Sequence, residues 1–368
     1  MNTKSRSRLI QISILFLVLS IILGGCSGAR HLVSVPTIKP ALAPGTDWPT
    51  QDWQTTTPEE QGMDSQRLSQ MLAEIEQSDL DLHSLLVIRH GAIVSETYYG
   101  TYHADTPHVL YSVTKSFIAT LVGIALDRGL IDSVDHLVLD YFPDSAITDP
   151  DPLRETMKLE HLLTMTTGLG WEDEDPVFGE MYRSQDWVAY VMNKPVIEQP
   201  GSRFNYCSGC SHVLSAVIQQ AAGTNTRDFA QEALFGPLGI TGYRWEVDSK
   251  GIPIGGWGLE MSPRDMAKLG YLYLHQGEWD GQQIVSSQWI KKATQKHIDT
   301  DDEFDYGYQW WINPRLGAYM ALGLYGQTVF VVPEADLIVV TTAKLENHDE
   351  IFRLIEAYIL PAIGPSDS

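Results

Sequence analysis

Apolar and polar residues alternate near both ends of the chain in the way that is typical of β-strands. Residues 85–89 and 92–99 carry this pattern on either side of His90-Gly91, which favours a tight turn. These two runs therefore predict a β-hairpin. Three further strands are predicted near the C-terminus, at residues 319–322, 328–332 and 337–342.

Helical periodicity dominates the sequence between these strands and beside them. Residues 65–78 repeat apolar side chains three and four positions apart, which places them on one face of a helix. The same spacing predicts helices over residues 117–125, 159–165, 213–218, 262–277 and 351–363.

Strands at both ends with helices between them predict an α/β fold. We expect one antiparallel sheet, flanked by helices and carrying a mostly helical inserted domain. The sheet is assigned to residues 57–110 and 316–368, and the insert to residues 111–315.

The composition agrees with the predicted globular fold, and the net charge argues against one class of binding partner. The chain has 368 residues, of which 43% are hydrophobic, enough for a globular body with a large core. Its net charge of −22 argues against nucleic acid as a partner, because a phosphate backbone repels a surface of that sign.

The first residues have the features of an export signal. A basic segment at residues 4–8 precedes an apolar run at residues 10–23, which is too short for a comfortable membrane span. The run ends in Leu23-Gly24-Gly25-Cys26, which resembles the bacterial lipoprotein box. The resemblance implies that Cys26 is lipidated and becomes the first residue of the mature protein. An uncleaved signal anchor is the alternative.

Either form would hold the protein at the membrane of the cell envelope, facing the periplasm or the cell exterior. We accordingly divide the chain into a lipoprotein signal peptide (1–26), a flexible tether rich in proline, threonine and alanine (27–56) and a folded domain (57–368).

Ser112 and Lys115 form the only Ser-x-x-Lys spacing in the sequence, directly before the helix predicted at residues 117–125. Residues three apart share a helix face, so the lysine can reach the serine hydroxyl. A helix N-terminus also offers N–H groups that favour negative charge. These are the requirements for an alcohol to attack a carbonyl. The alternative is a capping serine beside a solvated lysine.

Several long segments, taken in order, resemble the serine β-lactamase and penicillin-recognising superfamily, and in particular its class C β-lactamase-like branch. That branch includes 6-aminohexanoate-dimer hydrolases and family esterases. The resemblance covers residues 57–342, essentially the whole body. The matching segments are residues 111–117, 161–169, 200–206 and 323–327.

The resemblance implies a role for each residue that matches a family motif. Ser112 would be the nucleophile, Lys115 its activating neighbour, and Tyr206 the proton carrier between Ser112 and the leaving group. Gly326 matches the glycine of the family's Lys-Thr-Gly strand. The backbone N–H groups of Ser112 and Gln327 would then bind the oxyanion.

Two further residues are candidates for substrate contacts. Ser208 ends the Tyr-x-Asn/Ser element, and Trp171 closes the loop at residues 166–171, which in the family lies near the mouth of the site. The residues in place of the family's Lys-Thr are Leu324 and Tyr325, so the carboxylate of a β-lactam would find no cation there. The sequence therefore favours attack on an ester or amide.

We expect a serine hydrolase that cleaves a small amide or ester through an acyl-enzyme, without a metal or organic cofactor. The alternative is a penicillin-binding-like lipoprotein that is acylated by, or binds, cell-wall peptides without turnover. Retention of Ser112, Lys115 and Tyr206 together favours turnover. The sequence specifies no oligomeric state.

Three other features receive a structural interpretation. Ser211 and His212 are predicted to lie on the surface of a helix. Cys207 and Cys210 are interpreted as two small buried thiols, with a disulfide as the alternative. The acidic run at residues 172–175 is interpreted as a solvated loop, although it could also attract cationic substrates.

Overall fold

A computed structural model describes residues 48–143, 147, 151–174, 176–300 and 302–364 of the chain. The predicted signal peptide, Cys26 and the tether up to residue 47 lie outside the described residues. Within the described part of the chain, no helix is long and apolar enough to span a bilayer.

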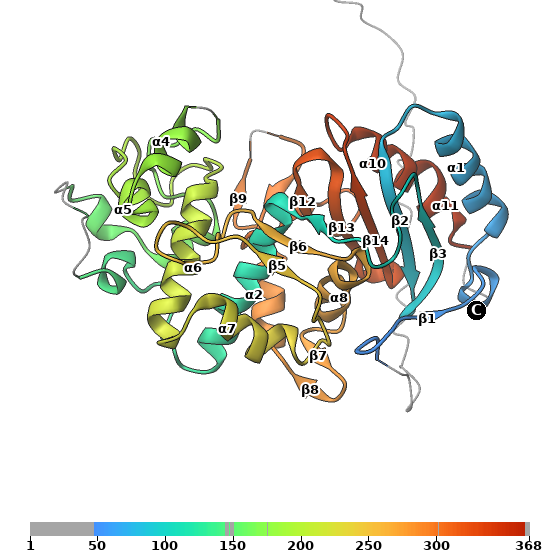
Figure 1. Cartoon of the computed structure of the whole chain (residues 1–368), viewed down its shortest axis with the longest axis horizontal. Helices are drawn as coiled ribbons and strands as arrows, with labels where there is room; N and C mark the ends of the chain where they lie inside the picture. Colours follow the sequence, from blue (N-terminus) through green and yellow to red (C-terminus); the bar gives the residue numbers. More distant parts are fainter. Residues whose placement is uncertain (1–47, 144–146, 148–150, 175, 301, 365–368) are drawn as a thin grey trace, which may run out of the picture. The chain divides into compact units, whose positions relative to one another are not determined.

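The main sheet joins strands from both ends of the sequence, as predicted (Figure 1). Its centre has the order β3-β2-β14-β13-β12, and each neighbouring pair is antiparallel. The bounds are β2 Leu82–Arg89, β3 Ala92–Tyr98, β12 Ala318–Gly323, β13 Gln327–Val332 and β14 Leu337–Ala343. Short strands extend both edges: β1 Gln54–Thr55, parallel to β3, and β11 Trp311–Asn313, β10 Asp305–Tyr306 and β9 Ile298–Asp299 beyond β12.

Alternation along the central strands divides the core into two layers. Leu85 and Val87 of β2 belong to one hydrophobic cluster, whereas Leu86 and Ile88 belong to the other. Successive side chains of a strand point to opposite faces, so a run that is apolar throughout must be covered on both sides.

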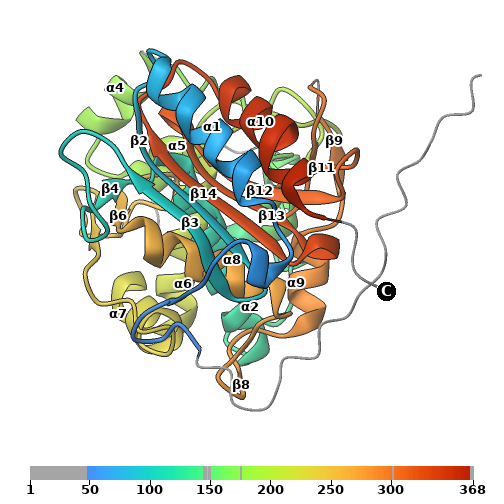
Figure 2. The same cartoon turned by 90° about the vertical axis from the view of Figure 1, so that its right-hand side faces the viewer.

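Helices from the two ends of the chain cover one face (Figure 2). They are α1 Ser65–Gln77 and the C-terminal segment, which runs from α10 Asp349–Leu354 through a π-helical turn at Ile355–Ile359 to α11 Leu360–Ala362. The opposite face is covered by α8 Pro263–Leu274 and by α2 Thr114–Asp127. Ser262 caps α8 by accepting the N–H of Asp265, and Pro263 begins the helix, as its sequence predicts.

The remaining elements form the inserted part. Its helices are α3 Leu159–Leu163, α4 Val177–Arg183, α5 Trp187–Met192, α6 Ser208–Ala222, α7 Thr226–Ala230 and α9 Ser287–Ala293. Its strands are β4 His108–Val109, β5 Arg244–Trp245 and β6 Leu259–Met261, which pair with one another, and the hairpin of β7 Glu278–Trp279 and β8 Gln282–Gln283. Helices α2 and α6 lie side by side (Figure 1).

Two predicted boundaries are wrong. The tether was assigned to residues 27–56, but residues 48–56 pack on the body: Trp48 contacts Tyr271, and the indole N–H of Trp53 donates to the carbonyl of Arg264 at 3.0 Å. Burial of these two aromatic rings explains why the segment packs on the body. The insert was assigned up to residue 315, yet β9 to β11 belong to the main sheet, because two- or three-residue strands leave too little alternation to recognise.

Candidate active site

Ser112 lies in the 3-10 turn Tyr111–Val113, which leads directly into α2. The predicted place at a helix N-terminus is therefore confirmed. Tyr111 has a φ of 46°, a left-handed conformation that costs energy for a bulky residue. The surroundings impose this sharp turn, because α2 is buried along nearly its whole length and Leu110 bonds to Leu259 O of β6 at 2.8 Å.

Lys115 is 1% exposed, and its amine is surrounded by oxygen acceptors. Nζ donates to Ser112 Oγ at 2.8 Å, to Ser208 Oγ at 2.9 Å and to the carbonyl of Gly256 at 2.8 Å. Burial lowers the pKa of Lys115 to about 8, although the charge of Asp173 acts in the opposite direction. A neutral amine is therefore accessible near neutral pH and can take a proton from Ser112.

Tyr206 completes this group. Lys115 Nζ lies 4.8 Å from the centre of its ring, and the Ser112 side chain lies near its hydroxyl. Burial raises the pKa of the phenol, while the nearby Ser112 side chain lowers it by a smaller amount. The ring stacks on Trp311 with an interplanar angle of 20°. Tyr206 is thus held as a neutral phenol next to both Ser112 and Lys115.

Asp173 belongs to the same hydrogen-bond network, which the sequence did not predict. Its Oδ1 accepts the N–H of Ser208 at 2.9 Å and the indole N–H of Trp171 at 2.7 Å, while its Oδ2 accepts the Ser208 hydroxyl at 2.6 Å. The reading of residues 172–175 as a solvated loop is wrong for Asp173, which turns inward, whereas Glu172 and Glu174 are exposed. Asp175 lies outside the described residues. No local pattern distinguishes Asp173 from its acidic neighbours.

The two candidates for substrate contacts have clear structural partners. Ser208 is 3% exposed and lies between Asp173 and Lys115, where it holds the amine in place. Trp171 is 2% exposed, orients Asp173 and also lines a cavity.

The carbonyl of Gly256 reaches Lys115 because its loop packs tightly on α6. A Cβ on Gly256 would lie 2.5 Å from Ser208 O, and one on Gly255 would lie 2.1 Å from Ser211 O. Further along the loop, Asp248 Oδ2 lies 3.1 Å from Nε2 of His212, and both side chains are fully buried. The prediction that Ser211 and His212 lie on a helix surface is wrong, since α6 is covered by this loop.

The turn between β12 and β13 differs from the predicted substrate strand. Gly323, not Gly326, packs against the Ser112 turn: a Cβ there would lie 2.2 Å from Leu110 O. Gly326 has a φ of 91°, and a Cβ there would meet Ile351 on the other face of the sheet. The side-chain amide of Gln327 donates to Leu324 O and Ala343 O. Close approach to the nucleophile turn is thus a property of Gly323.

Tyr325 lies in the same turn with a φ of 66°, and its ring contacts the ring of Tyr111 at 5.4 Å. Leu324 and Tyr325 are exposed, at 53% and 39%. Neither supplies a cation, and neither do Ala321 and Leu322 before Gly323. The two residues on either side of Gly323 therefore supply no cation.

Cys207 and Cys210 are fully buried and joined by a disulfide, with Cα atoms 5.2 Å apart. Their burial is confirmed, while the interpretation as free thiols is wrong. The first turn of α6 brings residues three apart on one face, which explains why the two side chains meet.

A cavity of about 380 Å³ adjoins Tyr206. Aromatic side chains form part of its wall, and three acids contribute charge, one of them paired with Arg203 at 3.3 Å. Its lining includes Trp171, Glu172, Glu198, Arg203, Phe204, Tyr206 and Asp302. This cavity offers space for a substrate beside Tyr206, while Ser112 and Lys115 are not among its lining residues.

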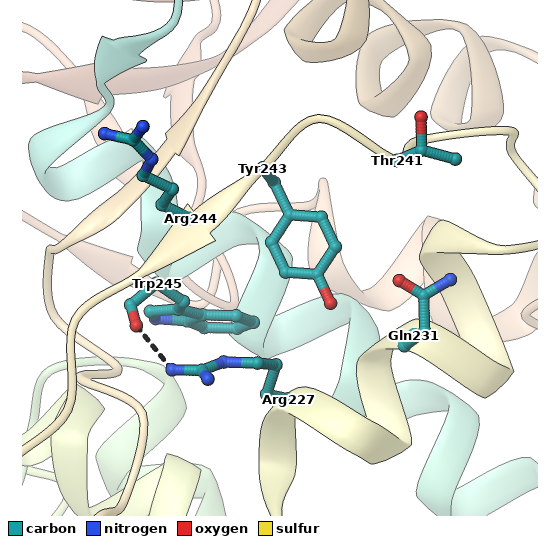
Figure 3. Close-up of a pocket in the computed structure, with 6 residues that line it drawn as sticks. All are labelled: Arg227, Gln231, Thr241, Tyr243, Arg244 and Trp245. Carbon is teal, nitrogen blue, oxygen red and sulfur yellow. Dashed lines mark hydrogen bonds between the residues drawn. The ribbon is translucent and has the colours of Figure 1, made fainter.

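A second cavity, of about 450 Å³, lies between α7 and β5 (Figure 3). Its lining includes Arg227, which donates to the Trp245 carbonyl at 2.6 Å, and the ring of Tyr243. None of Ser112, Lys115 and Tyr206 borders it. Over the described ranges, no group of three or more His, Cys, Asp or Glu side chains is arranged to hold a metal ion.

The fold and this arrangement of serine, lysine and tyrosine are those of a serine hydrolase. The chain belongs to the Beta-lactamase family, whose family model matches residues 61–360. A 6-aminohexanoate-dimer hydrolase of Paenarthrobacter ureafaciens is 24% identical over 306 residues, covering 77% of each chain. The family resemblance inferred from the sequence is confirmed.

Solved structures agree on the fold. EstCE1, a hydrolase with promiscuous acyltransferase activity, superposes with a TM-score of 0.68 at 18% identity over 82% of this chain and 98% of that one. The penicillin binding protein from Bacillus halodurans gives a TM-score of 0.64 at 19% identity over 78% and 99%. The predicted α/β fold with a β-lactamase-like arrangement is thus confirmed.

Proposed function

We propose that the protein is an envelope-anchored serine hydrolase that cleaves a small amide or ester through an acyl-enzyme on Ser112. The observation that carries this proposal is the 2.8 Å contact between Ser112 Oγ and the buried amine of Lys115, which also lies 4.8 Å from the centre of the Tyr206 ring. A nucleophile with an adjacent base whose pKa lies near neutrality is the arrangement that acyl transfer needs.

In the first half-reaction, neutral Lys115 accepts the Ser112 proton as Oγ bonds to the substrate carbonyl carbon. Tyr206 passes its proton to the leaving nitrogen or oxygen as the bond from that atom to carbon breaks, and the Lys115 ammonium returns a proton to Tyr206. The N–H of Ser112 and the N–H that follows Gly323, that of Leu324, stabilise the oxyanion. We choose Leu324 over Gln327 because Gly323 packs beside the Ser112 turn. Water then adds to the acyl carbon and gives a proton to Lys115. The bond between that carbon and Ser112 Oγ breaks, Oγ takes the proton back from Lys115, and the carboxylic acid leaves.

Esters and amides fit this site better than β-lactams. The residues that follow β12 beside Ser112 are Leu324 and Tyr325, and neither is a cation. They would leave the carboxylate of a β-lactam without a partner. A charge-assisted hydrogen bond contributes about 1.5–3 kcal/mol, or roughly one to two orders of magnitude in rate constant. The Paenarthrobacter relative, named for hydrolysis of an amide dimer, supports an amide as one substrate class.

Location in the envelope rests on the segment that ends in Cys26 and on the disulfide, since such bonds persist in oxidising compartments. Cys26→Ser should release the protein from the membrane fraction or leave an unprocessed precursor. A Cys26→Ser protein that is processed and sediments like the wild type would overturn the lipid anchor.

The function is tested by turnover of p-nitrophenyl esters, D-amino-acid amides and nitrocefin by the full chain purified in detergent. We expect many turnovers of an ester or amide, no turnover by Ser112→Ala, and a lower kcat/KM for nitrocefin than for the best ester. A product burst equal to the enzyme concentration and nothing afterwards would show acylation without turnover. Nitrocefin matching the best ester would refute the substrate preference.

A further inference from the structure

The Cys207–Cys210 disulfide lies between two residues of the proposed machinery. Tyr206, whose ring lies beside the Lys115 amine, directly precedes Cys207. Ser208, which bonds to Lys115 and Asp173, directly follows it. The crosslink therefore spans the point where the chain carrying Tyr206 enters α6.

The backbone changes direction at this point. Cys207 is extended, with φ −137° and ψ 93°, and it is the N-cap of α6, where its Sγ accepts the N–H of Cys210 at 3.0 Å. The disulfide joins this last extended residue to the first helical turn. It consequently fixes the direction of the Tyr206 segment relative to Ser208.

The surroundings leave the sulfurs little room to separate. Both cysteines are fully buried. The N–H of Cys207 donates to Met165 Sδ at 3.3 Å, and Thr167 Oγ1 lies 3.6 Å from Cys210 Sγ. Between the cysteines, a Cβ on Gly209 would lie 2.6 Å from the Trp171 ring. Close packing of this kind transmits a local displacement to its neighbours.

We propose that the Cys207–Cys210 disulfide is a positioning element for Tyr206 and Ser208, and that its reduction slows hydrolysis while the chain stays folded. The inference rests on the proposed function. A dithiol reductant supplies two electrons and two protons, breaking one S–S bond and forming two S–H groups, and itself becomes a disulfide. Two thiols occupy more room than one disulfide, so the turn carrying Tyr206 and Ser208 must shift.

The test compares the full-length wild type with the double variant Cys207→Ser/Cys210→Ala. Serine at the N-cap retains an acceptor for the first turn, so the variant removes the covalent bond and keeps the cap. We expect kcat on a neutral ester to fall at least tenfold, with KM within about threefold, because Tyr206 and Ser208 are displaced while the other residues that line the substrate cavity stay in place.

Leu214→Ala is the matched control. Leu214 is fully buried in the same helix and is absent from the network around Lys115. It should lower the melting temperature at least as much as the double variant and leave kcat within about threefold when measured well below that temperature. If the crosslink only stabilises the fold, the double variant and Leu214→Ala should both have a lower melting temperature and a nearly unchanged kcat.

Three outcomes would overturn the inference. Alkylation of two thiols in the unreduced, denatured wild type would overturn it, as would a wild-type kcat in the double variant. If the double variant does not fold, the wild-type protein is reduced and alkylated instead, and its fold is checked by circular dichroism. A folded product with full activity overturns the inference. A folded product with a low kcat supports it. Ser112→Ala in the same assay separates the two claims, since activity there would overturn the proposed function itself.

Discussion

The amine of Lys115 has three oxygen acceptors around it and almost no access to water. Removal from water disfavours the ammonium, whereas the three acceptors and the nearby carboxylate of Asp173 favour it. The titratable groups that face it are the carboxylate of Asp173 and the neutral phenol of Tyr206, with Tyr306 behind the phenol. The balance leaves a pKa of about 8, at which a lysine can exchange protons during turnover.

Activity should therefore depend on pH through Lys115. Below a pKa of about 8 the amine is protonated and cannot accept the Ser112 proton, so we predict that kcat/KM on a neutral ester rises about tenfold per pH unit from roughly pH 6 and levels off above roughly pH 8–9. Asp173→Asn should move the rising limb to lower pH, because it removes a charge that stabilises the ammonium. A rate that stays constant between these pH values would contradict the assignment.

Tyr206 is predicted to act in proton transfer and not only in packing. Tyr206→Phe keeps the ring, so the free energy of unfolding should change by about 1 kcal/mol or less. Loss of a proton carrier should lower kcat by roughly 10²–10⁴. The control is Tyr306→Phe, a fully buried tyrosine whose ring centre lies 6.5 Å from that of Tyr206. Equal kcat values for the two variants would show that Tyr206 has only a structural role.

At the scale of elements, the site depends on where β12 meets the turn before α2. Gly323→Ala would place a methyl group 2.2 Å from Leu110 O, and a backbone carbonyl cannot move aside. We predict a loss of roughly 1–3 kcal/mol in the free energy of unfolding and a clear fall in kcat. Gly242→Ala is the control, because nothing lies within 4 Å of its added Cβ. A Gly323→Ala enzyme with normal stability and kcat would show that the two elements are further apart.

The elements themselves could be predicted well, because each rests on local periodicity. Helix α1 ends one residue before its predicted end, and the β2–β3 hairpin turns at His90-Gly91 as expected. The register of the substrate strand could not be predicted. Gly323 and Gly326 lie in one short turn, and only the approach of Leu110, more than two hundred residues earlier in the chain, distinguishes them.

The site contacts that come from loops could not be predicted either, because they depend on segments far apart in the sequence. Ser112 and Lys115 are three residues apart on one helix, so their meeting follows from helix geometry. Asp173 and the Gly256 carbonyl arrive from loops whose paths depend on the whole insert. For the same reason, the burial of His212 follows from a loop around Asp248 and not from the pattern of α6.

At the scale of the whole molecule, the net charge is −22, and a small part of it lies at the cavity where a substrate would enter. Glu172 and Asp302 line the cavity beside Tyr206, while Glu198 there is paired with Arg203. An ester that carries an amine should therefore bind better than a neutral ester of the same size, and salt should weaken the difference.

Glu172→Gln tests this preference. Since an exposed charge contributes about 1 kcal/mol or less, we predict that kcat/KM for the amine-bearing ester falls up to roughly fivefold while that for the neutral ester is unchanged. Glu174→Gln is the control, because this neighbouring glutamate is exposed but does not line the cavity. Equal effects of both variants on both esters would refute steering by the cavity.

The central claim, that Ser112 is the nucleophile activated by Lys115, is tested most directly by covalent labelling. The full chain in detergent is treated with a fluorophosphonate and its peptides are analysed by mass spectrometry. We predict one adduct, on the peptide that contains Ser112, and no adduct in Ser112→Ala, with much slower labelling in a folded Lys115→Ala protein. An adduct on another residue, or labelling that persists in Ser112→Ala, would contradict the account.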